Sequence, residues 1–132
     1  MAIPKRSRPS PAATAQAGLR AFFRIAELWK LSAEEQRTLL GAPPRSTFFK
    51  WKKGDVHALP RDVLERISYV LGIFKALEIL LPRSDAADGW IRRPNGAAPF
   101  GGRSALERML SGNVGDLYAV RQYLDAARGG WA

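Results

Sequence analysis

The chain has 132 residues, of which 46% are hydrophobic, and its formal net charge is +9. This length suits one domain or two very small ones, and the hydrophobic content is sufficient for a packed core, which excludes a globally disordered protein. The sequence contains no cysteine, which excludes disulfides and thiolate metal sites and favours a reducing compartment.

No apolar run in the sequence is long enough to span a membrane. The first segment, "AIPKRSRPSPAATA", lacks the apolar stretch of a secretory signal. We therefore expect a cytoplasmic protein with no membrane partner.

The positive charge is concentrated in residues 1–82, which hold 14 Lys and Arg against 7 Asp and Glu. Residues 83–132 hold 7 against 5. A basic N-terminal part favours an anionic partner, and nucleic acid is the usual one. Charge that serves solubility alone is the alternative.

The predicted elements begin with a disordered basic arm over residues 1–13, which are mainly Pro, Ser, Ala and basic residues. A helix is predicted from Thr14 to Lys30, where apolar residues recur at three- and four-residue steps.

Two short helices are predicted next. Ser32 and Glu35 match a capping box that opens the first of them, and Gly41 matches its C-terminal stop. The segment "RSTFFKWKKG" is predicted to form the second, which Gly54 ends. Two short helices joined by a glycine-containing turn match the helix-turn-helix motif.

A long apolar helix is predicted between Pro60 and Pro82, and Gly72 inside it is expected to weaken or bend it. Residues 85–102 are predicted to form a loop with at most one short turn near Trp90.

A second capping box, Ser104 with Glu107, opens a short helix that Gly112 ends, and a last helix is predicted from Val114 to Ala127. The sequence shows no strand pattern and no repeat. The predicted fold class is all-α, with a helix-turn-helix domain followed by a small helical domain.

An enzyme is the least favoured class of protein. The single histidine, His57, lies in a predicted loop without a nucleophile or base beside it. The segment "FGGRS" could hold a phosphate through backbone N–H groups and Arg103, but it lacks the lysine and spacing of a P-loop. We predict no catalytic residue, no metal site and no cofactor.

The second short helix is the candidate recognition helix, whose N-terminal residues would face base edges in the major groove. Arginine pairs with guanine, and hydroxyl groups bond either donors or acceptors. The predicted base contacts are Arg45, Ser46 and Thr47. The predicted phosphate contacts are Lys50, Lys52 and Lys53. An exposed basic helix with no partner is the alternative.

Phe48 and Trp51 share one face of this helix and are predicted to be core anchors, whereas the role of Phe49 stays open. The arm residues Lys5, Arg6 and Arg8 either reach an adjacent groove or phosphate or belong to a tail without a partner.

The segment "GWIRRPNGAAPFGGRSALERMLSG", residues 89–112, resembles the toxin-binding domain of Xre/MbcA/ParS-like antitoxins. With the upstream helix-turn-helix, the resemblance covers residues 16–128. The matching residues are Trp90, Ile91, Arg92, Arg93, Pro94, Asn95, Gly101, Gly102, Arg103, Ser104, Leu106, Leu110, Ser111 and Gly112. Ala105 stands where the family often has proline, and Phe100 stands where an aliphatic residue is common.

The resemblance implies a type II antitoxin that represses its own operon by DNA binding and neutralises a RES-domain toxin encoded beside it. Such toxins look like ADP-ribosyltransferase relatives that consume NAD, so NAD is the expected substrate of the toxin. The implied organisation is an arm over 1–13, a DNA-binding and dimerisation region over 14–82 and a toxin-binding domain over 83–132.

A homodimer is expected because operators are usually two-fold when their repressors are. Phe74 and Leu77 of the long helix are the candidate dimer contacts, since this helix is apolar around much of its girth. The alternative is that it is simply the central core helix.

The toxin contacts are predicted in the loop and at the C-terminus. Prolines limit φ in the loop, and Gly101 and Gly102 allow turns that other residues cannot make, so we expect a loop that is ordered before binding. The candidate contacts are Arg92, Arg93, Asn95, Arg103, Arg121, Arg128 and Trp131, with Arg121 and Arg128 projecting from the last helix.

For several of these residues the alternative to a toxin contact is a role in the structure of the chain itself. For Arg92, Arg93 and Arg103 the alternative is a role in the internal fold, and for Trp131 it is folding back onto the chain's own surface. At the level of function, the alternatives are a helix-turn-helix repressor without a toxin and a toxin-binding module that has lost DNA binding.

Overall fold

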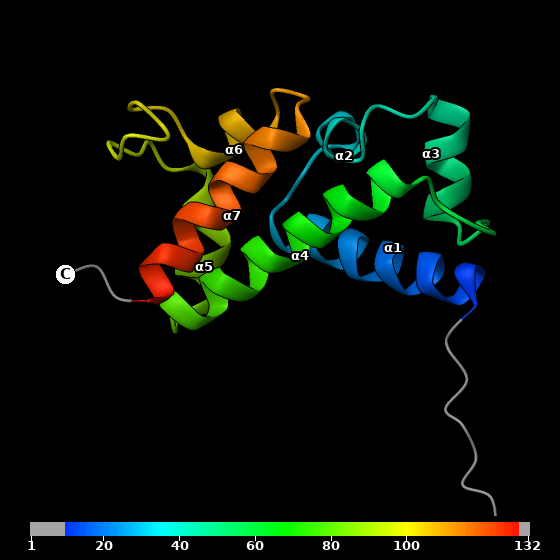
Figure 1. Cartoon of the computed structure of the whole chain (residues 1–132), viewed down its shortest axis with the longest axis horizontal. Helices are drawn as coiled ribbons and strands as arrows, with labels where there is room; N and C mark the ends of the chain where they lie inside the picture. The colour runs from blue at the N-terminus through cyan, green and yellow to red at the C-terminus, as the bar shows by residue number, and fades with distance from the viewer. Residues whose placement is uncertain (1–9, 130–132) are drawn as a thin grey trace, which may run out of the picture.

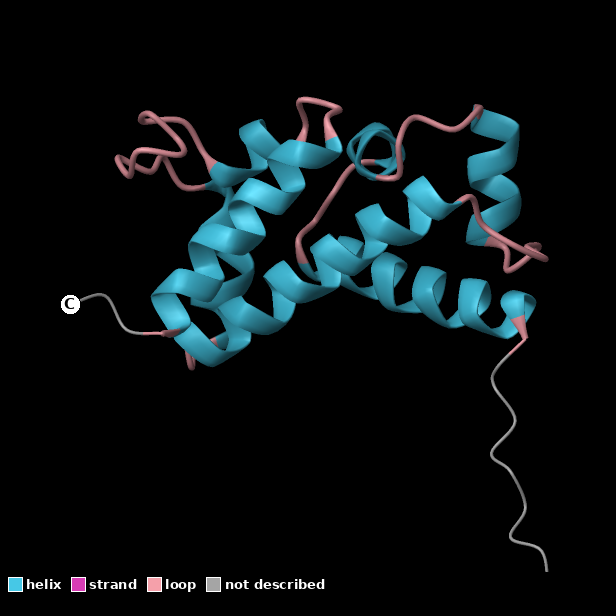
Figure 2. Ribbon diagram, in the orientation of Figure 1, coloured by secondary structure: helices cyan, strands magenta, loops and turns pink. Residues whose placement is uncertain are grey.

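The computed structural model describes residues 10–129, and within that range it consists of helices joined by loops and turns, with no strand (Figure 2). This confirms the predicted all-α class. The helices are α1 (Pro11–Leu28), α2 (Ala33–Leu39), α3 (Arg45–Lys52), α4 (Arg61–Leu80), α5 (Ser84–Gly89), the 3-10 helix η1 (Trp90–Arg92), α6 (Ala105–Met109) and α7 (Val114–Arg128). None of these helices is long and apolar enough to cross a membrane.

Helix α4 runs through the middle of the molecule, with α1 and α3 toward its N-terminal end and α5 and α7 toward its C-terminal end (Figure 1). Its buried apolar side chains recur along the whole helix and belong to one apolar cluster that extends from α1 to α7. They are Val63, Ile67, Val70, Ile73, Ala76 and Leu77. Both halves of the chain therefore share one core.

Helix α1 begins at Pro11, so the predicted start at Thr14 was wrong, as was the assignment of residues 11–13 to the arm. The Ser10 hydroxyl accepts a hydrogen bond from the Ala13 amide at 3.1 Å. A serine N-cap followed by proline at the first helical position is a helix start, because proline lacks the N–H that would have no partner there. The predicted arm residues Lys5, Arg6 and Arg8 lie outside the described residues.

The predicted helix-turn-helix is confirmed as α2 and α3. The capping box is complete, because the Glu35 amide donates to the Ser32 hydroxyl at 3.1 Å and the Ser32 amide donates to the Glu35 carboxylate at 2.8 Å. Gly41 follows α2 with a φ of +93°, a conformation that favours glycine. Phe48 and Trp51 are buried in the core, as predicted.

Residues 85–89 were predicted as part of a loop, and this is wrong, since they belong to α5, whereas the short turn expected near Trp90 is present as η1. The segment is too short for an apolar period to be recognised in its sequence. Ala87 and Ile91 are nevertheless buried, at 2% and 0% exposure. The burial of these two side chains against the rest of the molecule, rather than local propensity, stabilises the segment as helix.

Gly72 gives space to a side chain of a neighbouring helix. A Cβ atom built at Gly72 would overlap the guanidinium group of Arg121, which reaches across from α7. That group donates to the Ser68 carbonyl of α4 at 3.4 Å and pairs with Asp125 at 3.2 Å. The glycine therefore permits close contact between α4 and α7.

We predict that Gly72→Ala raises the free energy of unfolding by about 1 kcal/mol in an Arg121→Ala background, because alanine is the better helix former by about that amount. In the wild-type background the gain should be smaller, because the added methyl group displaces the Arg121 guanidinium. Urea unfolding of the four variants measures the coupling between the two sites.

Gly115→Ala is the matched control, because a Cβ atom at Gly115 would meet nothing within 4 Å. Its effect should be the same with and without Arg121. An equal effect of Gly72→Ala in the two backgrounds would contradict the packing role of Gly72.

Candidate functional site

Helix α3 presents a basic face that is fixed from behind by two buried aromatic residues. Phe48 and Trp51 are 1% and 9% exposed and attach the helix to the core. The residues of α3 and its C-terminal cap that lie exposed are Arg45, Ser46, Phe49, Lys50, Lys52 and Lys53. Because the aromatic anchors fix the rotation of α3, its outward face is also fixed.

The predicted base contacts do not all lie on that face. The side chain of Arg45 is 70% exposed and its guanidinium group lies 3.1 Å from the Glu34 carboxylate of α2. Ser46 is exposed as well, but Thr47 is half-buried. At 100° per residue, Thr47 lies on the side of the helix that carries Phe48 and Trp51. The structure thus brings Arg45 and Ser46 together on the outer face and turns Thr47 away from it.

The predicted phosphate contacts Lys50, Lys52 and Lys53 are all exposed. Lys52 lies on the flank of α3, where its ammonium group is 5.8 Å from the Phe48 ring centre and 6.0 Å from the Phe23 ring centre. Contact with aromatic faces favours a cation and limits the directions in which this side chain extends.

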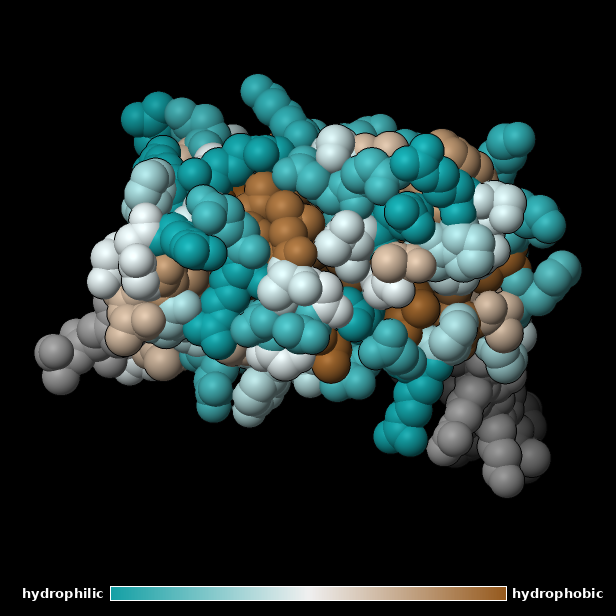
Figure 3. All heavy atoms as spheres, turned by 90° about the horizontal axis from the view of Figure 1, so that it is seen from above, coloured by the Kyte–Doolittle hydropathy of each residue, from teal (hydrophilic) through white to brown (hydrophobic). Residues whose placement is uncertain are grey.

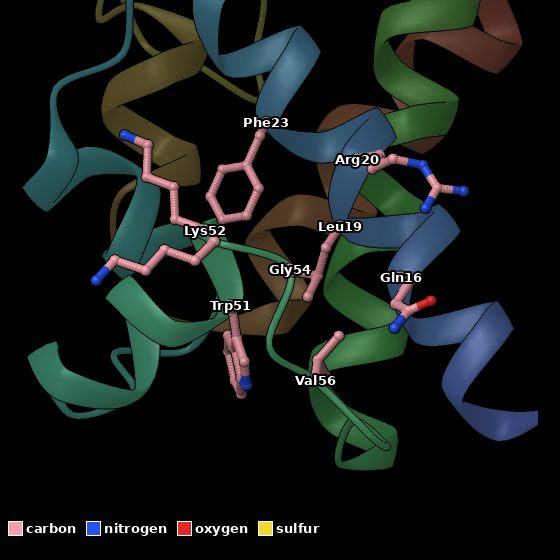
Figure 4. A pocket seen from close by; sticks show the side chains of 9 residues that line it. Gln16, Leu19, Arg20, Phe23, Trp51, Lys52, Gly54 and Val56 are labelled. Carbon is pink, nitrogen blue, oxygen red and sulfur yellow. The ribbon is translucent and has the colours of Figure 1, made fainter.

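A shallow pocket of about 270 Å³ lies between α1 and the C-terminal end of α3 (Figure 4). Its apolar lining comes from Leu19, Phe23, Trp51 and Val56, and its polar and charged lining from Gln16, Arg20, Lys52 and Lys53. No carboxylate belongs to this lining, so the pocket continues the basic surface of α3 onto α1.

At the other end of the molecule, residues 93–104 form a closed loop. The Asn95 amide donates to the Arg103 carbonyl at 3.0 Å, and the Gly102 amide donates to the Asn95 carbonyl at 2.8 Å. Gly101 and Gly102 have φ values of +58° and +89°, so the predicted use of these glycines is confirmed. The Asn95 side chain accepts a hydrogen bond from the Ala97 amide, which uses its oxygen within the loop.

Aromatic contacts attach this loop to the core. Phe100 is 4% exposed and its ring centre lies 5.0 Å from that of Tyr123 and 5.9 Å from that of Trp90. Trp90 is half-buried and stacks on Tyr123 at 6.3 Å. Trp90 and Phe100 therefore hold the loop against Tyr123 of α7.

A second set of contacts, which was not predicted from the sequence, joins the loop to α6 and α7. Arg108 pairs with Asp116 at 3.0 Å and donates to the Pro99 carbonyl at 2.6 Å. The Ser111 hydroxyl donates to the other Asp116 oxygen at 2.6 Å. The hydrogen bond from Ser111, and then the Arg108 guanidinium, lower the pKa of Asp116 below its usual value. No spacing in the sequence indicates this cluster, because its members meet only when the helices pack.

Arg92 makes its contacts within the chain. Its guanidinium group donates to the Trp29 and Lys30 carbonyls at 3.1 and 2.8 Å and lies 3.5 Å from the Glu35 carboxylate. These contacts join η1 to the connection between α1 and α2. They favour the internal role over the toxin contact for Arg92.

Arg121 was expected to project from the last helix, and this is wrong, since it lies back across α4 beside Gly72. Arg128 is exposed and its nearest carboxylate oxygen, from Asp125, is 3.9 Å away. Trp131 lies outside the described residues.

Arg93 and Arg103 are candidate toxin contacts of the loop that remain outward in this structure. Both are exposed, and neither forms an ion pair among residues 10–129. They lie at the two ends of the closed loop, so the loop presents two guanidinium groups on a defined backbone.

The two predicted dimer contacts differ in accessibility. Leu77 is 1% exposed and packs in the core, so its assignment to a dimer surface was wrong. Phe74 is half-buried beside Trp29, with 6.2 Å between the ring centres. The face seen from above is mostly hydrophilic and carries only small hydrophobic areas (Figure 3).

Comparison with known proteins matches each half of the chain separately. Residues 9–72 match the antitoxin Xre-like helix-turn-helix domain, and residues 76–130 match the antitoxin Xre/MbcA/ParS C-terminal toxin-binding domain. The uncharacterized protein y4oB of Sinorhizobium fredii is 57% identical over 124 residues, which cover 94% of each chain.

The two matches meet inside α4, the helix that both halves share. The helix-turn-helix implies DNA binding, and the second domain implies a cognate toxin. Proteins of this family are binding proteins rather than enzymes, which agrees with the class predicted from the sequence. The chain therefore belongs to the Xre/MbcA/ParS family of type II antitoxins, with an N-terminal helix-turn-helix domain and a C-terminal toxin-binding domain.

Proposed function

We propose that this antitoxin neutralises a RES-domain toxin that degrades NAD and represses its own operon. Residues 14–82 bind operator DNA and dimerise, and residues 83–132 bind the toxin. The observation that carries the proposal is the separation of α3 and the 93–104 loop, which lie toward opposite ends of the molecule (Figure 1). Because the two surfaces do not overlap, one molecule can hold DNA and toxin together.

The DNA-binding part of the proposal rests on the outward face of α3. Arg45 and Ser46 supply groups for base edges, and Lys50, Lys52 and Lys53 supply charge for phosphates. The ion pair between Arg45 and Glu34 lies at an exposed position, so exchanging it for a contact with DNA costs little.

The toxin-binding part rests on the ordered loop and on the end of the chain. Arg93 and Arg103 are cations without an ion pair among the described residues, on a backbone that is closed before binding. A loop that is already ordered loses little entropy when it docks. We propose that the C-terminal end of α7 and the residues after it cover the entrance of the NAD cleft, where Arg128 meets acidic groups of the toxin.

The identity of the toxin follows from the family resemblance alone, so a repressor without a toxin is the second candidate. A neighbouring gene that encodes a RES-domain protein favours the first function, and its absence favours the second. A gel shift with the antitoxin's own promoter distinguishes both from a toxin-binding module that has lost DNA binding.

We also propose that the antitoxin is a homodimer and that the flank of α4 around Phe74 contributes to the contact. A hollow of about 400 Å³ lies there, and its apolar lining includes Leu28, Phe74 and Leu81. Leu28 is 37% exposed, so apolar surface is available at this place without unfolding.

The DNA proposal predicts different results for two basic residues. Arg45→Ala should weaken operator binding by about 1–3 kcal/mol and relax the base preference, because a base contact is lost. Lys52→Ala should weaken binding to all sequences alike and lower the salt dependence of log K by about 1, because a phosphate contact is lost. Fluorescence anisotropy with promoter and unrelated duplexes measures both effects.

Lys75→Ala is the control for loss of one positive charge, since Lys75 is exposed on α4 outside the α3 surface. If Arg45→Ala and Lys52→Ala bind promoter DNA as tightly as Lys75→Ala does, α3 is not the recognition helix.

The dimer proposal predicts a dimer at micromolar concentration in sedimentation velocity. Phe74→Glu should shift the equilibrium toward monomer, because it introduces a charge into the apolar contact. Ile79→Glu introduces the same charge at a residue that is 53% exposed elsewhere on α4, and it should leave the dimer intact. A monomeric wild-type chain, with and without promoter DNA, would reject the proposal.

The neutralisation proposal predicts that truncation after Ala127 separates the two functions. The truncated chain lacks Arg128 and Trp131 but keeps α3 and the 93–104 loop, so it should still bind the promoter. It should no longer fully protect cellular NAD when the toxin is expressed. Full protection by the truncated chain would move the inhibitory surface to the loop, where Arg93→Ala with Arg103→Ala is then the decisive variant.

A further inference from the structure

Phe49 is an exposed aromatic residue on a face that is otherwise polar and basic. It is 49% exposed, and the other large apolar residues with comparable exposure in the described chain are Leu28, Ile79 and Tyr118. Leu28 adjoins the apolar hollow beside α4, and Tyr118 contacts Tyr69 with 5.7 Å between the ring centres. Phe49 differs because it belongs to the helix that is proposed to enter the DNA groove.

Phe49 lies on the outward face of α3. Arg45 precedes it by one turn and Lys53 follows it by one turn, so the three side chains lie in one row. The buried Trp51 lies nearly opposite to Phe49 on the helix, and the buried Phe48 lies beside it. A partner that covers the row must therefore accept one apolar group between two cations.

The ring of Phe49 is also held in place. It meets the ring of the buried Phe48 edge to face, with 5.3 Å between the ring centres and 67° between the ring planes. A ring that is supported in this way contacts a partner with little loss of side-chain freedom.

The pattern of charge identifies the partner as duplex DNA rather than a protein surface. Lys53 forms no ion pair among residues 10–129, so an apolar protein interface would bury it without a counter-charge, at considerable cost. In the major groove the cations beside Phe49 meet phosphates and guanine acceptors. The one apolar group that base edges offer there is the 5-methyl group of thymine, and phenylalanine is a suitable contact for it.

We propose that Phe49 recognises the 5-methyl group of a thymine in each operator half-site, within one or two base pairs of the base that Arg45 contacts. One helical turn advances by about 5.4 Å, and stacked base pairs are about 3.4 Å apart, which sets this separation. The inference rests on the proposed DNA-binding function and adds a specificity contact to it.

The experiment uses the full chain and a duplex from its own promoter, located by footprinting. Each thymine in the protected region is replaced in turn by uracil, which removes the methyl group and keeps the base pair. We expect one thymine per half-site at which this change weakens binding by about fourfold, the effect of removing one methyl group from an apolar contact.

Variants identify the residue that senses the methyl group. Phe49→Ala should bind the thymine and uracil duplexes equally at that position. Arg45→Ala should bind both more weakly but keep the fourfold difference between them. Tyr118→Ala removes an exposed aromatic residue of α7 and should behave as wild type.

The outcomes separate the inference from the function on which it rests. If the wild-type chain binds the promoter but no uracil substitution matters, or if Phe49→Ala keeps the difference, the inference is wrong and DNA binding stands. If Phe49→Ala instead changes the sedimentation coefficient or toxin binding, Phe49 is a protein contact. If the wild-type chain does not bind the promoter, both the DNA-binding function and the inference fail. If Phe49→Ala does not fold, the uracil scan on the wild-type chain still tests the inference, because the absence of any thymine effect overturns it.

Discussion

Burial of one helix by both halves of the chain is the constraint on which the rest of this antitoxin depends. Helix α4 packs against α1 on one side and against α7 on another, and its buried residues form one cluster with those of both helices. A small chain cannot easily stabilise two separate cores, because small domains bury a low fraction of their surface. Sharing α4 avoids this difficulty and holds the DNA-binding and toxin-binding surfaces in a fixed relation.

The arginines strengthen this arrangement and so reduce the positive charge that is available to partners. Arg66, Arg92, Arg108 and Arg121 each donate to a backbone carbonyl in another segment. Arginine suits this use because its planar group donates in several directions and stays charged. The net charge of +9 therefore overstates the charge free for binding. The positive charge of the α3 lysines stays available to a partner. Lysine binds phosphate well as a point charge.

The loop between η1 and α6, which is the proposed toxin contact, is ordered in the free chain. Two backbone hydrogen bonds close it, Phe100 attaches it to Tyr123, and Arg108 fixes the carbonyl of Pro99. Each contact lowers the freedom of the loop in the free chain, so less is lost on binding. The same contacts explain a composition rich in glycine and proline without requiring that every residue of the loop touch the toxin.

The sequence by itself determined the order of most helices and their ends. Capping boxes such as Ser32 with Glu35 and C-terminal glycines such as Gly41 act within one helical turn, so their pattern is visible in a short window. It also determined the family, through the ordered motif of residues 89–112. Only the tertiary structure decided that Arg92 and Arg121 serve the fold, that residues 84–89 are helical and that Leu77 is buried. The reason is distance along the chain. Arg92 finds its carbonyl acceptors 62 and 63 residues away and Arg121 finds its own 53 residues away, and no local pattern specifies such partners.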